Sequence, residues 1–79
     1  MSCSIIVEKA VERAKTMMRA RMETRAVKFN LQRSLEWALV NTRDEGVKHR
    51  LSASLLELER ASSVMDVERV IERLSNPPI

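Results

Sequence analysis

The chain carries no glycine and no proline between residues 4 and 41, and its 79 residues include one glycine and two prolines in all. These residue types break helices most strongly, so their absence favours a helix over this run. Apolar residues recur within it at helical spacing. They are Val7, Val11, Ala14, Met18, Met22 and Phe29. Because residues three or four apart share one face of a helix, the pattern predicts an amphipathic helix in the N-terminal half.

After Phe29 the apolar pattern changes phase. A second run, rotated from the first, consists of Leu31, Leu35, Ala38 and Leu39. Asn30 stands between the runs, and asparagine is a favoured N-cap, so one interpretation is a turn near Asn30. The other is a single helix of about 57 Å, at ~1.5 Å per residue, whose buried face changes along its length. Because one asparagine is a weak helix breaker, we expect the continuous helix.

Capping motifs mark two further helix starts. In the sequence TRDE, Thr42 and Glu45 match a capping box, which predicts a helix that begins at Arg43. Its apolar stripe comprises Val47, Leu51, Leu55, Leu58 and Ala61 or Ser62. In SSVMD, Ser63 is the expected N-cap of a last helix, with Asp66 as its partner. The stripe of that helix comprises Val64, Val67, Ile71 and Leu74. The two prolines of the C-terminal SNPPI sequence end it.

These elements predict an all-α protein with a small core, because a chain of this length buries only about 60% of its unfolded surface. A single cysteine excludes an internal disulfide, and Cys3 and His49 are too few ligands for a structural zinc. We expect one helical domain over residues 1–79, with short disordered ends at 1–3 and 76–79. The long N-terminal helix should fold back on one or two shorter C-terminal helices as a hairpin or bundle. Self-association, with a homodimer favoured, should complete the core.

Basic residues are concentrated in one segment: residues 13 to 33 include seven basic residues and one acidic residue, a net charge of +6. One hypothesis is a nucleic-acid-binding regulator that contacts phosphates through this segment. Its contacts would be Arg19, Arg21, Arg25, Lys28 and Arg33. On one continuous helix, however, the charges flank the apolar stripe on both sides instead of gathering on one open face. The sequence also lacks a zinc motif, a glycine-rich turn and an aromatic platform for stacking bases.

Protein docking suits the same segment better. Methionine and aromatic side chains would supply apolar area, while the surrounding arginines select a partner protein with an acidic-rimmed groove. The expected docking residues are Met18, Met22, Arg25, Phe29, Arg33 and Trp37. Trp37 is either an interface anchor or a stacking partner for Arg33 one turn earlier. A membrane-surface helix is disfavoured, because Glu8, Glu12 and Glu23 lie on the same helix.

Catalysis is not predicted. His49 is the only histidine and lies among basic residues, and the carboxylates alternate with arginines as on solvated helix faces. We therefore expect a non-enzymatic module without metal or cofactor, acting as a regulator, inhibitor, chaperone or assembly adaptor. We expect no signal peptide, because the apolar run of the N-terminal MSCSIIVEK is too short, and no run of ~20 apolar residues occurs in the sequence. With its single thiol, the chain is expected to be cytoplasmic.

Overall fold

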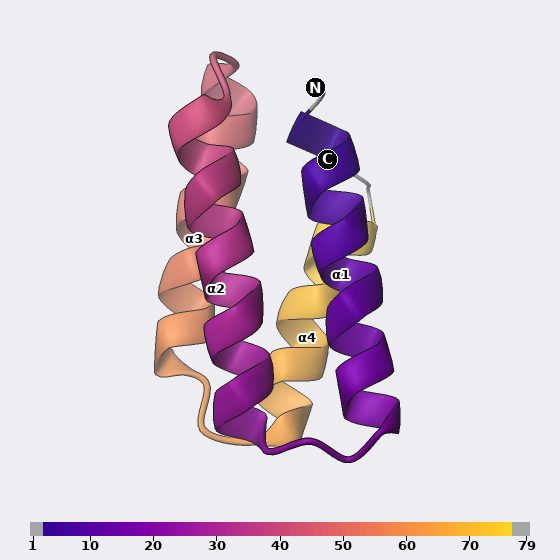
Figure 1. Ribbon diagram of the computed structural model, residues 1–79. Helices are drawn as coiled ribbons and strands as arrows, with labels where there is room; N and C mark the ends of the chain where they lie inside the picture. Colours follow the sequence, from indigo (N-terminus) through magenta and orange to yellow (C-terminus); the bar gives the residue numbers. More distant parts are fainter. Residues whose placement is uncertain (1–2, 77–79) are drawn as a thin grey trace.

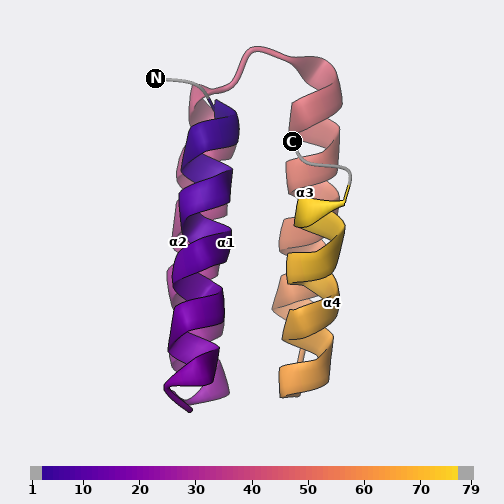
Figure 2. The ribbon, with the colours of Figure 1, turned by 90° about the vertical axis from the view of Figure 1, so that its right-hand side faces the viewer.

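The computed structural model describes residues 3–76, which form four helices: α1 (Cys3–Arg19), α2 (Thr24–Asn41), α3 (Glu45–Arg60) and α4 (Val64–Ser75). Successive helices run in opposite directions (Figure 1). Figure 2 shows α1 beside α2 and α3 beside α4, and the two pairs join because α2 packs on α3 and α1 on α4. The described residues contain no strand, so the all-α prediction is confirmed as an antiparallel four-helix bundle.

The prediction of one long N-terminal helix is wrong, because α1 ends at Arg19, eleven residues before Asn30, and the chain turns at residues 20–23. In this turn the Arg21 N–H donates to the Met18 carbonyl (3.0 Å), and the Met22 N–H donates to the Met17 carbonyl (3.1 Å). Arg21 adopts a left-handed backbone conformation with φ 58°. These features define a Schellman C-cap. Glycine is the usual residue at such a position, so an arginine there gave no sequence signal.

The change of apolar phase reflects two separate helices. Asn30 lies inside α2, where its carbonyl accepts a hydrogen bond from the Ser34 hydroxyl (3.2 Å). Folding α1 back on α2 lets both apolar stripes face one core, within a body whose longest dimension is 34 Å. A helix of about 57 Å would not fit that body. The energetic reason for the turn is therefore burial, since the two stripes can share a core only if the chain reverses.

The start of α3 also differs from the prediction. The helix begins at Glu45 instead of Arg43, and its N-cap is Asp44, whose carboxylate accepts from the Val47 N–H (3.1 Å). The Thr42 hydroxyl accepts from the Asp44 N–H (3.3 Å) and so supports the cap from outside the helix. Aspartate and threonine are both favoured N-caps, so the sequence alone did not distinguish the two starts.

The start of α4 matches the prediction. The Ser63 hydroxyl accepts from the Asp66 N–H (3.3 Å), and the Asp66 carboxylate accepts from the Ser63 N–H (3.3 Å), which completes a capping box. The Ser62 N–H donates to the same carboxylate (3.1 Å). These donors, the Ser62 N–H first, hold the pKa of Asp66 below its usual value. The helix ends at Ser75, two residues before the first proline of SNPPI.

The core is aliphatic and draws on all four helices. The largest fully buried side chains are Leu31, Leu35, Leu51, Leu58, Val27, Val67 and Val70. Each predicted stripe contributes to it, but Met22 and Phe29 at the end of the first stripe are exposed. The ends predicted to be disordered lie outside the described residues, except for Cys3, which begins α1, and Asn76. The Asn76 N–H donates to the Glu72 carbonyl (3.0 Å).

Candidate docking surface on helix α2

The solvent side of α2 carries large apolar side chains. Phe29, Trp37 and Val40 are 59%, 53% and 83% exposed. At about 100° per residue they lie on the side of α2 opposite to its buried residues. Those buried residues are Val27, Leu31, Leu35 and Ala38. A helix that faces water normally turns a polar side outward, so α2 has an apolar face that the bundle does not cover.

Arg33 lies against one aromatic residue of this face, Phe29. The carbon at the centre of its guanidinium lies 5.7 Å from the centroid of the Phe29 ring, which is cation–π geometry. The sequence analysis named Trp37 as one possible stacking partner of Arg33. In the structure the guanidinium of Arg33 lies over the ring of Phe29 instead, one turn before it. No carboxylate among residues 3–76 forms an ion pair with Arg33. The cation is therefore held against the aromatic ring and is open to an incoming anion.

Two shallow grooves adjoin Phe29, Arg33 and Trp37. The first runs along α2 and is also lined by Gln32, Glu36, Val40 and Asn41. The second lies between α2 and α1, where Ile6 and Arg13 of α1 join Asn30 and Ser34 of α2. Of the residues that the structure describes, two arginines and no carboxylate line this second groove. We call Phe29, Arg33, Trp37 and Val40 the α2 face.

The six predicted docking residues do not form one surface. Phe29, Arg33 and Trp37 lie together on the α2 face, and Arg25 is exposed one helical turn before Phe29. Met18 and Met22 instead line a separate pocket at the α1–α2 turn. The division follows from that turn, which ends the first apolar stripe and starts a new helix with its own faces.

The five predicted phosphate-binding residues are spread over α1, the turn and α2. The Lys28 ammonium donates to the carbonyls of Ala61 (2.6 Å) and Glu59 (3.5 Å) at the end of α3. Arg19 donates to the Thr16 hydroxyl (3.3 Å), and Arg33 lies on Phe29. Lys28 therefore caps the end of α3. The predicted continuous helix gave no indication of this contact.

Sequence reasoning missed Val40, Ile6 and Arg13. Val40 follows Phe29, Arg33 and Trp37 in the i, i+4, i+8, i+11 pattern of a helix face, so the signal was present. Ile6 and Arg13 had no such signal, because only the reversal at the α1–α2 turn brings α1 beside the α2 face.

Other kinds of site have no support in the described part of the chain. Within residues 3–76, no group of three or more His, Cys, Asp or Glu residues is placed to hold a metal ion. None of the described helices has the length and apolar character needed to cross a bilayer. His49 is exposed on α3.

Comparisons of this chain with protein families, curated proteins and solved structures found no match. Its class is therefore defined by its own geometry, as a small antiparallel four-helix bundle with an exposed aromatic face on one helix.

Proposed function

We propose that this protein is a non-enzymatic interaction module that docks a partner protein through the α2 face. The observation that carries the proposal is the exposure of Phe29, Trp37 and Val40 on the side of α2 opposite the core, around an arginine that has no acidic partner among residues 3–76. Burying an apolar side chain of this size contributes about 1.5–3 kcal/mol. Tryptophan and arginine are also the residues that most often dominate binding energy at protein interfaces.

The chemistry of the face defines the partner. The grooves beside Phe29 and Trp37 fit a ridge of apolar side chains such as an amphipathic helix presents. Arg33 and Arg13 would meet carboxylates on the rim of that helix, whereas Glu36 is the single acidic residue among the groove linings. The mechanism is helix-to-helix docking, with apolar burial giving affinity and the arginines selecting an acidic partner.

Nucleic-acid binding through residues 13 to 33 is the competing proposal. The Lys28 ammonium donates to the Ala61 carbonyl at the end of α3, and the Arg33 guanidinium lies against the Phe29 ring. Arg19, Arg21 and Arg25 belong to the end of α1, the turn and the start of α2, so they do not line one helix face. This arrangement favours protein docking as the function to test first.

A second copy of this chain is the first partner to examine. Sedimentation at increasing concentration reports self-association, and Trp37, the lone tryptophan, reports burial of the α2 face through its fluorescence. If the homodimer uses this face, dimerisation should shift the indole emission to shorter wavelength, and the Phe29→Ser variant should remain monomeric. If the Phe29→Ser variant still dimerises, self-association uses another surface.

The wider test is affinity capture from the native lysate, with and without nuclease. Tagged wild type is compared with Phe29→Ser, Trp37→Ser and the matched control Met65→Ser, which removes an exposed apolar side chain from α4 instead. A stoichiometric protein partner that survives nuclease and is lost with both α2 variants but not with the control supports docking. Partners that vanish with nuclease, or that all three variants retain, would overturn the proposal.

A further inference from the structure

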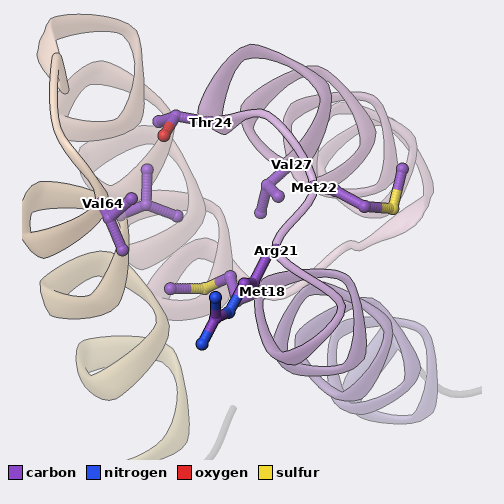
Figure 3. Close-up of a pocket in the computed structure, with 7 residues that line it drawn as sticks. Met18, Arg21, Met22, Thr24, Val27 and Val64 are labelled. Atoms are coloured by element: carbon purple, nitrogen blue, oxygen red, sulfur yellow. The ribbon is translucent and has the colours of Figure 1, made fainter.

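A second exposed apolar site lies at the end of the bundle that holds the α1–α2 turn. It is a pocket of about 320 Å³ between α1, α2, the turn and the start of α4. Its lining residues are Met18, Arg21, Met22, Thr24, Val27, Val64 and Val67. Figure 3 shows Val64 on one side of this space, with Val27 and Met18 facing it, while the Met22 thioether points away from Val64. The walls are thus mainly aliphatic, and the site is separate from the α2 face.

Among the described residues, Arg21 is the single charged one that lines this pocket. Its side chain extends from the turn to the side of Met18, in the space between the turn and α4 (Figure 3). The left-handed backbone of Arg21 and the two C-cap hydrogen bonds of the turn fix where this side chain leaves the chain. An arginine in a left-handed turn is less favourable than glycine by about 1–2 kcal/mol, so the residue is unusual at this place.

The guanidinium of Arg21 has no acidic partner among the described residues. Asp66, the acidic residue in the first turn of α4, already has hydrogen-bond and ion-pair partners. Its carboxylate accepts from the Ser62 and Ser63 N–H groups and pairs with Arg69 at 3.8 Å. The pocket therefore combines an apolar interior with one unpaired cation beside it.

We propose that this pocket binds a small amphiphilic carboxylate of the medium-chain fatty-acid class. The alkyl chain would lie against Met18, Val27 and Val64, where methionine adapts to chains of different shape. The carboxylate would accept two parallel hydrogen bonds from the Arg21 guanidinium, which is the geometry in which arginine binds carboxylates best. The volume is at the lower end of small-molecule sites, and mostly apolar walls with few polar groups are typical of them.

The test is a titration of isotope-labelled protein with sodium octanoate, followed by NMR of the methyl groups. Octanoate should bind saturably and shift the signals of Met18, Val27, Val64 and Val67 without shifting those of the α2 face. Two ligands of the same chain length separate the contributions: octanol should bind more weakly, and octylammonium should not bind. Equal binding of all three would show apolar partitioning without recognition of the carboxylate and would overturn the proposal.

Arg21→Gly removes the cation while keeping a residue that favours the left-handed turn, so the fold should be preserved. Octanoate affinity should fall about tenfold or more, as expected for loss of a charge-assisted hydrogen bond. Arg19→Gln is the matched control, because it removes a nearby positive charge that does not line the pocket. If Arg21→Gly binds octanoate like wild type, or if both variants weaken it equally, Arg21 is not the carboxylate site. Neither result bears on partner docking through Phe29 and Trp37.

Discussion

The Lys28 ammonium lies 2.6 Å from the carbonyl oxygen of Ala61, so a side chain of α2 closes the end of α3. The last carbonyls of a helix have no partner within it and carry partial negative charge, which a cation satisfies. The contact spans residues far apart in the chain and holds α2 against α3. Lys28 therefore belongs to the framework of the bundle, not to its basic surface.

The first prediction concerns this contact. Lys28→Met keeps most of the aliphatic chain but removes the donor, and we expect the free energy of unfolding to fall by about 1 kcal/mol. For a domain of this size that corresponds to a decrease of roughly 4–8 °C in melting temperature. Arg25→Met, an exposed cation on the same helix, should change stability by less than about 0.5 kcal/mol. Equal effects of the two substitutions in thermal unfolding would contradict the capping role.

The second prediction concerns the turn between α1 and α2. Because Arg21 has φ 58°, Arg21→Gly should leave the free energy of unfolding unchanged or raise it by up to about 1 kcal/mol. Arg21→Val should lower it, because a β-branched side chain disfavours the left-handed conformation. Chemical denaturation of the two variants checks this opposite behaviour. A more stable valine variant would mean that the left-handed turn is not maintained.

The third prediction is a pH dependence caused by Asp66. Its pKa is below the usual 3.8 in the folded protein, mainly because its carboxylate accepts from the Ser62 N–H and interacts with the side chain and the N–H of Ser63. Asp66 therefore stabilises the fold above pH 3.8, and this contribution is lost as the pH falls through the lower folded-state pKa. Denaturation at a series of acidic pH values should show a steeper loss of stability for wild type than for Asp66→Asn. Parallel curves for the two proteins would contradict the assignment.

The fourth prediction separates the α2 face from the core. Phe29→Ser and Trp37→Ser should change the free energy of unfolding by no more than about 0.5 kcal/mol, since both side chains are exposed in the bundle. Leu35→Ala, on the opposite side of α2, should lower it by about 2–5 kcal/mol, because Leu35 is fully buried. Thermal unfolding of the monomeric protein distinguishes these cases. A large destabilisation by Phe29→Ser would place the ring in the core.

Local sequence patterns were sufficient for some features of the helices. The apolar stripes of α3 and α4 and the Ser63–Asp66 capping box could be read directly, because helix periodicity and N-caps depend on residues only a few positions apart. Phe29 and Trp37 were proposed as docking residues, but Phe29 had been assigned to the apolar stripe of a long helix, whereas the structure leaves it exposed on α2. The exposed side of a single helix is set by its own spacing once its buried side is known.

The arrangement of the helices could not be read in this way. Arg21 gives no turn signal, and its left-handed conformation is unfavourable locally; it persists because the reversal lets α1 and α2 bury their apolar stripes in a common core. That reversal separates Met18 and Met22 from Phe29 and Trp37, brings Arg13 beside Arg33, and accompanies the docking of Lys28 on α3. Local spacing thus indicated the main apolar stripes of the helices, but not the turn at residues 20–23 or the exact start of α3. The energy of packing those sides together, which no short segment contains, established where the chain turns and which side chains meet.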